Sequence, residues 1–353
     1  MQRENNELNQ GASLDSQVPV KKRIDWIDVS RGIAFLMVIY RHLGDYKNDS
    51  IMRYFMPVFL SIFFFVSGYL FKEKQSFLKV FEQRTRTLFL PFLILGTVVI
   101  VMSQLCSFKD GLTWVESFKG LLFQNHKNQL LWFIAALYLY SLIFYWIERF
   151  CKSDWTLLIV SVLLYIGNGV YNYCLGMPSY TSVWHIGMMG YSCYFMGLGK
   201  LYKKHENKIK LNNKLFWVLT VVYFAFIAMT TRKYSFMGSP MIIDCMFITT
   251  LGTLLLIHVC KNWKFIMHNT FLKFVGANTL FYFAFHGKVY AVLIKGTNWI
   301  LNVLGLLHND AAVTIMGFVL VFIDALVLIP ITMIINKYLS FALGKGFKLY
   351  NCK

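Results

Sequence analysis

Long apolar segments recur along the whole chain, and they constrain its fold more than any other feature. A helix needs about 20 residues to cross the hydrocarbon core of a bilayer, and about ten segments are long and apolar enough to do so. These segments are 26–45, 52–71, 88–105, 130–147, 155–172, 183–201, 215–231, 240–260, 274–294 and 311–336. Backbone groups in lipid must be hydrogen-bonded within the segment, so the spans are expected to be helices. The sequence therefore predicts an all-α, polytopic membrane helix bundle with about ten transmembrane helices.

The composition excludes a water-soluble globule. Hydrophobic residues make up 57% of the chain and charged residues only 15%, whereas soluble domains carry about 25% charged residues. One hydrophobic core cannot bury this much apolar surface. The seven cysteines form no C-x-x-C pair, so neither a disulfide framework nor a metal site is predicted.

Basic residues cluster in the connections between the spans. Lys and Arg total 35 against 17 Asp and Glu, a formal net charge of +18. With the N-terminus inside, the basic connections 72–86 and 200–214 face the cytoplasm, as the positive-inside rule requires. The sequence therefore predicts an N-in, C-in protein of the cell (inner or plasma) membrane, whose charge requires no nucleic-acid partner. Its predicted parts are a polar cytoplasmic tail 1–22, a membrane domain 23–340 and a basic cytoplasmic tail 341–353.

The first span carries ionisable residues on both sides of a short apolar stretch. Such residues are costly inside a membrane and mark function by default. Arg31 and His42 are eleven steps apart, so at 100° per residue they lie within about 20° of one another on one helix face. Asp28 belongs to the same stripe. A rise of 1.5 Å per residue places His42 about 16 Å deeper than Arg31. We therefore expect a polar path from the cytoplasmic surface towards the middle of the membrane.

Both residues also have simpler interpretations. Arg31 can be a positive-inside anchor paired with Asp28, and His42 can be a buried histidine that is hydrogen-bonded to a carbonyl. However, burial of a neutral histidine without partners is expensive. Imidazole is also the side chain best suited to proton transfer near neutral pH. His42 is therefore a candidate for proton transfer.

Two later spans contain further candidates. In the ninth span, Asn278, Tyr282 and His286 recur at i, i+4 and i+8, so they share one helix face. This stripe predicts substrate hydrogen bonding, a second catalytic histidine, or a polar clamp between helices. In the second span, Ser67 precedes Gly68. Small residues at this position indicate close helix approach rather than a nucleophilic serine.

The connection from Lys72 to Arg86 has the pattern of a basic amphipathic segment. Such a segment usually lies on anionic lipid. Its arginines Arg84 and Arg86 are on the same predicted side as Arg31, and together they can bind a phosphate-rich cytosolic ligand through charge-assisted hydrogen bonds. The composition leaves both interpretations open.

Several segments, taken together and in this order, resemble the motifs of the acyltransferase-3 family of integral membrane proteins. The resemblance is to the branch of fucose 4-O-acetylase-like and surface-polysaccharide O-acetyltransferases, and it extends over roughly residues 23–340. It includes a motif of an arginine, ten residues and a histidine. The matching segments are Arg23–Ile33, Arg31 with His42, Phe65–Tyr69, Leu131–Ile134 and Gly276–His286.

The resemblance implies transfer of an acyl group, usually acetyl, from a cytosolic acyl-CoA to a hydroxyl of a surface glycan or its lipid-linked precursor. It implies that His42 is the general base or acyl relay, that Arg31 orients or binds the donor, and that Arg84 and Arg86 hold the phosphates of coenzyme A. The family commonly has two residues between those two arginines, whereas Arg84-Thr-Arg86 has one. Supporting or substrate-binding roles are expected for Asp28, Ser67, Asn278, Tyr282 and His286.

Acetyl-CoA is thus expected as a co-substrate, with no permanently bound cofactor and no metal. The expected partners are acyl-CoA, a carbohydrate or glycolipid acceptor and the lipid bilayer. Two other classes of function remain compatible with the residues. One is a secondary transporter in which Arg31 and His42 form a proton relay. The other is a non-catalytic partner in polysaccharide assembly.

Overall fold

The structure is a computed structural model, and it describes residues 23–105, 112–124, 131–175, 183–209, 211–229 and 242–338. Every regular element in these ranges is a helix. In chain order the elements are α1 (Asp25–Arg41), η1 (Gly44–Tyr46), α2 (Asp49–Phe55), α3 (Ser61–Tyr69), α4 (Phe77–Arg84), η2 (Thr85–Phe89), α5 (Leu90–Leu105), α6 (Trp114–Phe123), α7 (Trp132–Phe150), α8 (Asp154–Leu175), η3 (Val183–Met188), α9 (Met189–His205), α10 (Asn213–Met229), α11 (Ile242–Asn262), α12 (Lys264–Met267), α13 (Thr270–Ala277), α14 (Thr279–Val303) and α15 (Asp310–Tyr338). The predicted tails 1–22 and 341–353 lie outside the described residues.

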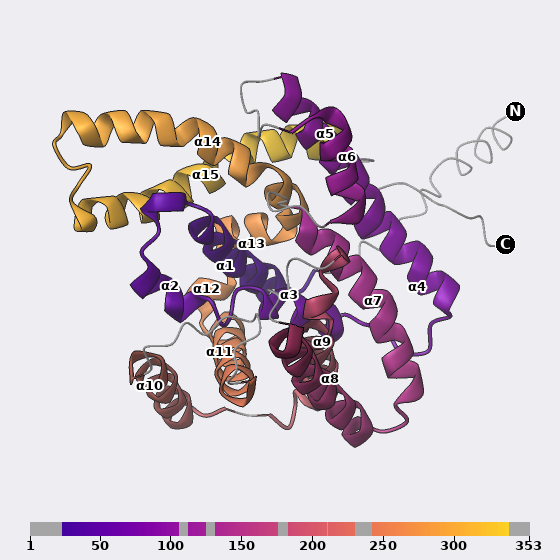
Figure 1. Ribbon diagram of the computed structural model, residues 1–353. Coiled ribbons are helices and arrows are strands. Elements are labelled where there is room, and N and C mark those ends of the chain that lie inside the picture. Colours follow the sequence, from indigo (N-terminus) through magenta and orange to yellow (C-terminus); the bar gives the residue numbers. More distant parts are fainter. Residues whose placement is uncertain are drawn as a thin grey trace, which may run out of the picture.

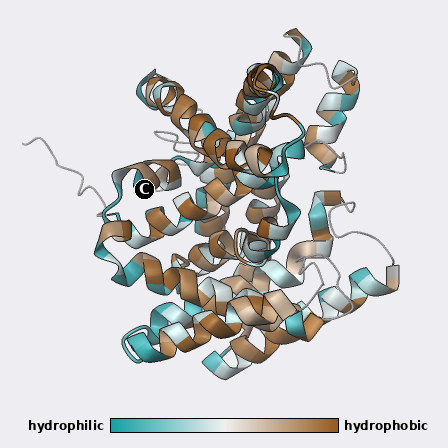
Figure 2. Ribbon diagram, turned by 90° about the vertical axis from the view of Figure 1, so that its left-hand side faces the viewer, coloured by the Kyte–Doolittle hydropathy of each residue, from teal (hydrophilic) through white to brown (hydrophobic). Residues whose placement is uncertain are grey.

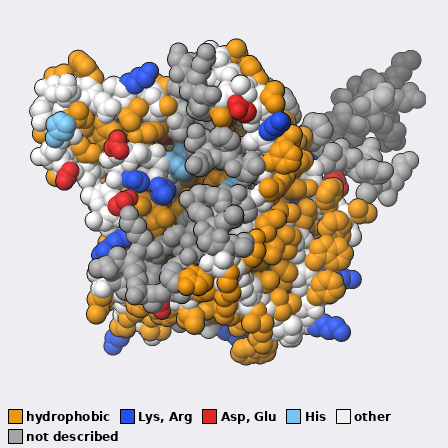
Figure 3. Space-filling view, in the orientation of Figure 1, with side chains coloured by type: hydrophobic (Ala, Val, Ile, Leu, Met, Phe, Trp, Pro, Cys, Tyr) orange, Lys and Arg blue, Asp and Glu red, His pale blue; other side chains and the backbone are white. Residues whose placement is uncertain are grey.

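Five helical segments of the described residues are long and apolar enough to cross a bilayer. They are Phe77–Leu105, Trp132–Phe150, Asp154–Cys174, Ile242–Asn262 and Asp310–Tyr338. Apolar residues run along most helices (Figure 2) and cover a broad part of the molecular surface (Figure 3). An apolar surface of this extent is typical of contact with lipid. The predicted all-helical membrane protein is thereby confirmed, while the count of about ten spans and the orientation of the termini stay predictions.

Three of the expected continuous spans are interrupted. The span 52–71 is divided into α2 and α3 by a turn at 56–60 that contains Pro57, whose ring removes a backbone donor. The span 274–294 is divided at Asn278, where φ is −118° and ψ is 17°. The first span ends at Arg41 instead of continuing to residue 45. Local capping and proline chemistry thus override the hydropathy pattern at these positions.

Helix α1 lies at the centre of the bundle, in contact with α3, α11, α13, α14 and α15 (Figure 1). It crosses α13 with the two backbones touching. A Cβ atom on Gly276 would lie 1.6 Å from the Asp28 carbonyl oxygen, and one on Gly32 would lie 2.2 Å from the Leu272 carbonyl oxygen. Glycine is therefore required on both helices where they cross.

The contact of α3 with α9 is of the same kind. A Cβ atom on Gly68 would lie 1.9 Å from the Met196 carbonyl oxygen, and one on Gly199 would lie equally close to the Phe65 carbonyl oxygen. This confirms the close helix approach predicted from Ser67 and Gly68. The Ser67 hydroxyl is buried and has no hydrogen-bond partner in the structure.

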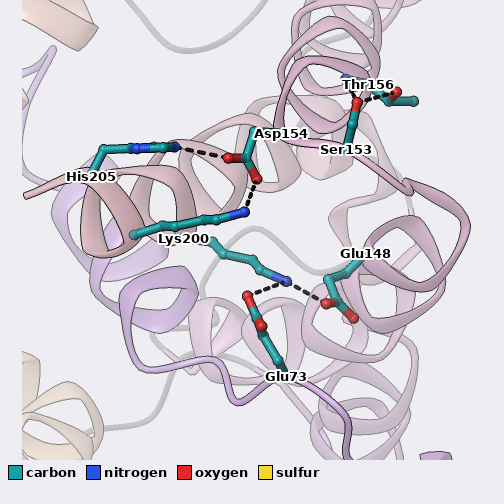
Figure 4. Close-up of polar contacts among 8 residues, drawn as sticks. Glu73, Glu148, Ser153, Asp154, Thr156, Lys200 and His205 are labelled. Carbon is teal, nitrogen blue, oxygen red and sulfur yellow. Dashed lines mark hydrogen bonds and ion pairs between the residues drawn. The ribbon is translucent and has the colours of Figure 1, made fainter.

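Ion pairs join the ends of α7, α8 and α9 (Figure 4). The Lys200 ammonium bridges Glu148 and Glu73, and Asp154 accepts from Lys204 at 2.7 Å and contacts His205 at 2.9 Å. Lys200 has only 12% of its side chain exposed. These pairs fix the end of the bundle that carries the basic connection predicted to face the cytoplasm.

Candidate functional site

The local sequence explains where α1 begins and ends. Asp25 and Asp28 occupy its first turn, where negative charge is favourable for the helix dipole. At the other end, His42 has φ −96° and ψ 5°, so the chain leaves the helix at this residue. Gly44 then takes a positive φ of 55°, which turns the chain into η1. His42 is consequently the C-cap residue of α1, and its backbone N–H donates to the Ile39 carbonyl oxygen at 2.9 Å.

His42 and His286 face one another across the contact between α1 and α14. Their ring centroids are 5.3 Å apart and the rings are inclined by 61°. His42 is exposed, whereas His286 is 1% exposed. The two residues come from the two stripes that the sequence analysis singled out. The structure thus brings the predicted histidines together in one place.

The hydrogen bonds of His286 define its tautomer. Its Nδ1 lies 2.9 Å from the Tyr282 carbonyl oxygen, which can only accept. A neutral His286 therefore carries its proton on Nδ1 and presents a lone pair at Nε2. That Nε2 atom is buried and has no hydrogen-bond partner among the residues that the structure describes. An unsatisfied acceptor next to His42 is suited to bind a hydroxyl or to orient the neighbouring imidazole.

Aromatic rings pack behind the histidine pair. Phe35 is fully buried, and its ring centroid lies 5.5 Å from that of His286, 5.6 Å from that of Tyr282 and 4.7 Å from that of Phe283. The stack continues from Phe283 to Phe133 at 4.9 Å. Water is excluded on this side, which strengthens electrostatic interactions at the imidazoles.

Two cations meet near the other end of α1. Arg31 is half-buried on α1, and Arg84 is half-buried at the end of α4. The positive charge of Arg31 acts on Arg84. Asp28 attracts Arg31 but forms its ion pair with Arg23, at 3.7 Å. The interpretation of Arg31 as an anchor paired with Asp28 therefore stays a prediction, as does the one in which Arg31 and Arg84 share an anion.

Arg86 lies two residues further along, half-buried in η2, where the helix widens to a π-turn. The sequence analysis expected Arg84 and Arg86 to act as a pair. At roughly 100° per residue, two residues of separation direct the side chains to different sides of the chain. Arg84 is therefore the member of the pair that the structure associates with Arg31.

Two residues of the second stripe join helices. The Asn278 amide donates to the Phe274 carbonyl oxygen at 2.8 Å and its oxygen accepts from Asn336 at 2.8 Å. The Tyr282 hydroxyl donates to the Ala325 carbonyl oxygen at 2.9 Å. These bonds tie α13 and α14 to α15. Asn278 and Tyr282 thus have the contacts of the predicted polar clamp, and His286 is the member of the stripe that meets His42.

Tyr290 is a residue that the sequence analysis missed. Its hydroxyl donates to the Leu43 carbonyl oxygen at 2.6 Å, directly after His42. Tyr290 continues the stripe of Tyr282 and His286 by one more turn, so the same periodicity signals it. The Tyr46 hydroxyl also donates to the Asn298 side chain, at 2.5 Å. Helix α14 therefore holds the turn that carries His42.

Within the described residues, no group of three or more His, Cys, Asp or Glu side chains is arranged to hold a metal ion. Asp324, on α15, is a buried carboxyl whose two oxygens have no hydrogen-bond partner in the structure. Its neighbour Ala325 accepts the Tyr282 hydrogen bond. Asp324 therefore lies near Tyr282, which is one helical turn before His286 on α14.

Residues 24–335 match the family model described as an acyltransferase domain. No curated protein and no solved structure gave a match. The matched range contains both histidines, both arginines and the aromatic rings of the candidate site. Because this match extends over most of the chain, the chain belongs to the acyltransferase-3 family of membrane proteins.

Proposed function

We propose that this membrane acyltransferase transfers an acetyl group from cytosolic acetyl-CoA to a hydroxyl of a surface glycan or its lipid-linked precursor, in the cell membrane. The observation that carries the proposal is the pairing of His42 with His286 at one end of α1, with Arg31 and Arg84 near the other end. Acyl transfer from a coenzyme A thioester to an alcohol requires a base beside the reacting groups. It also requires a cationic site that binds the phosphates of coenzyme A.

The donor fits the separation between the two positions. Eleven residues of helix from Arg31 to His42 correspond to about 16 Å. The coenzyme A molecule likewise carries its pyrophosphate and its sulfur at opposite ends of a long flexible arm. Phosphate oxygens bind to Arg31 and Arg84 through charge-assisted hydrogen bonds. The thioester then lies beside His42.

The reaction needs one proton carrier. His42 accepts the proton of the acceptor hydroxyl as its oxygen attacks the thioester carbonyl and forms the new C–O bond. When the tetrahedral intermediate collapses, the C–S bond breaks and His42 returns the proton to the leaving thiolate. General base catalysis of this kind contributes typically 10²–10⁴-fold. His286 supports the reaction by orienting His42 or the hydroxyl through its Nε2 lone pair.

The direct test uses purified protein in lipid vesicles with acetyl-CoA and a glycan acceptor. Release of free coenzyme A thiol and O-acetyl incorporation, measured by mass spectrometry, are expected to rise together. A transporter with an intramembrane proton relay would leave acetyl-CoA intact, and a non-catalytic partner in polysaccharide assembly would be inactive when purified alone. Either result contradicts the proposal.

Substitution of Arg31 is expected to affect the donor more than the chemistry. Arg31→Gln should raise the KM for acetyl-CoA by about 10- to 100-fold, because a hydrogen bond to a charged group is worth about 1.5–3 kcal/mol. Initial rates over a range of acetyl-CoA concentrations measure this change. Arg23→Gln is the matched control, since 64% of the Arg23 side chain is exposed at the same end of α1.

Acetyl-pantetheine, which lacks the nucleotide phosphates, provides a second control for this experiment. Wild type and Arg31→Gln should use it with the same KM, because the lost contacts are to phosphate. If Arg31→Gln has the wild-type KM for acetyl-CoA, Arg31 does not bind the donor. Equal losses with both donors would instead indicate a structural role.

A further inference from the structure

A cavity of about 360 Å³ lies apart from the histidine and arginine groups, between the end of α9 and helices α10 and α11 (Figure 1). Its volume is within the range of small-molecule sites. One part of its lining is aliphatic: Ile209, Leu211, Leu219, Leu251, Leu254 and Leu255. The other part is polar: Tyr202, Glu206, His258, Lys261 and Asn262. The cavity thus has an apolar part and a charged part.

The apolar part is accessible from the lipid-facing side of the bundle. Ile209 and Leu254 line the cavity and are 50% and 37% exposed. Next to it, α10 carries Val218 and Val221, which are 58% and 65% exposed. A bilayer covers such apolar side chains. A hydrocarbon chain can therefore enter the cavity laterally, and each buried methylene contributes about 0.8 kcal/mol.

The polar part holds one cation and one anion in a loose pair. The Lys261 ammonium lies 3.4 Å from Glu206 Oε2 and 3.4 Å from the Tyr202 hydroxyl. Close charge-assisted hydrogen bonds are about 2.7–2.9 Å long, and the Lys204–Asp154 bond at 2.7 Å is one of them. Lys261 and Glu206 are therefore not fully engaged by each other, and each can bind a further group of opposite charge.

Aromatic rings hold the Lys261 ammonium in place. It lies 5.6 Å from the Trp26 ring centroid and 5.1 Å from the Tyr202 ring centroid. Glu206 Oε2 also accepts from the Tyr69 hydroxyl at 2.9 Å, and no described residue bonds to its Oε1 atom. Cation–π contacts and this hydrogen bond keep both charges oriented before any ligand binds. The site is thus pre-organised for a ligand that carries two charges.

We propose that this cavity binds a phospholipid with a primary-amine headgroup. An acyl chain lies against the leucines, the phosphate binds Lys261, and the ammonium binds Glu206. A headgroup with one negative and one positive charge matches the two charges of the cavity. A choline headgroup has no N–H to donate to Glu206, and an anionic headgroup without an amine would meet Glu206 with repulsion.

The test is lipid retention by the purified full-length protein. The protein is reconstituted in nanodiscs of equimolar phosphatidylethanolamine, phosphatidylcholine and phosphatidylglycerol, and the lipids that remain bound are counted by native mass spectrometry. Wild type should retain phosphatidylethanolamine at least about fivefold over each of the other two. Equal retention of the three lipids, or a preference for phosphatidylglycerol, overturns the proposal.

Variants separate the two charges. Glu206→Gln keeps the shape of the side chain and should abolish the preference for phosphatidylethanolamine over phosphatidylcholine, while Lys261→Met should lower retention of all three lipids. Lys264→Met is the matched control, because Lys264 is exposed on α12 and does not line the cavity. An unchanged preference in Glu206→Gln contradicts the headgroup assignment. Because the experiment measures no acyl transfer, its outcome is independent of the proposed enzymatic function.

Discussion

Replacement of His42 by alanine is expected to lower kcat for acyl transfer by at least about 100-fold, because a general base contributes typically 10²–10⁴-fold. The protein should still fold and insert. His42 is an exposed C-cap residue that bonds α1 through its backbone N–H, which alanine retains, and surface substitutions of this kind usually change stability by less than about 0.5 kcal/mol. The measurement is thiol release from acetyl-CoA, normalised to the amount of folded protein in membranes.

The control is His308→Ala, an exposed histidine in the connection between α14 and α15. It should retain the wild-type rate. If His42→Ala also keeps the wild-type rate, the base assignment is wrong and the membrane acyltransferase uses another residue.

His286 allows a sharper version of the same experiment. If His286 acts by orienting His42 or the hydroxyl that His42 deprotonates, the effects of the two substitutions cannot add. The double variant His42→Ala with His286→Ala should then be no slower than His42→Ala alone. If the loss of kcat in the double variant instead equals the product of the two single-variant losses, His286 has a separate role, such as donor positioning.

The sequence was sufficient for the class of fold and for the two stripes. Apolar segments of membrane-spanning length required helices, and the eleven-residue separation of Arg31 and His42 required one helix face. Neither inference depends on tertiary structure. The close approach of another helix at Gly68 could also be predicted from the sequence, because small residues in a membrane helix usually mark a helix contact.

The contact between the two stripes could not be predicted from the sequence. His42 and His286 are far apart in the chain, and their contact depends on how α1 crosses α13 and α14. A single sequence contains no measure of such a crossing. The interruption at Pro57 was visible as a proline within an apolar segment, whereas the interruption at Asn278 depends on its hydrogen bonds to Phe274 and Asn336. Helix ends and the contacts between helices that are distant in the chain are therefore what the sequence alone could not supply.

The crossing of α1 and α13 leads to the second prediction. Gly276→Val should destabilise the protein by about 3 kcal/mol, at the upper end of the usual cost of overpacking. The Cβ atom of the new valine would lie 1.6 Å from the Asp28 carbonyl oxygen, which belongs to the backbone and not to a flexible side chain. The helices must separate, so the face of α1 that carries Asp28 and Arg31 shifts. A lower Tm in detergent and a raised KM for acetyl-CoA are expected together.

Gly276→Ala and Gly296→Ala form a matched pair for this test, because both glycines are helical and only one is crowded. A Cβ atom on Gly296 would meet nothing within 4 Å. Alanine at Gly296 should raise stability by roughly 0.5–1 kcal/mol, since glycine is the poorer helix former. Alanine at Gly276 should lower the Tm, and valine should lower it further. Equal Tm values for the two alanine variants would mean that α13 can move away from α1 without cost, and the position of Arg31 would then not depend on this crossing.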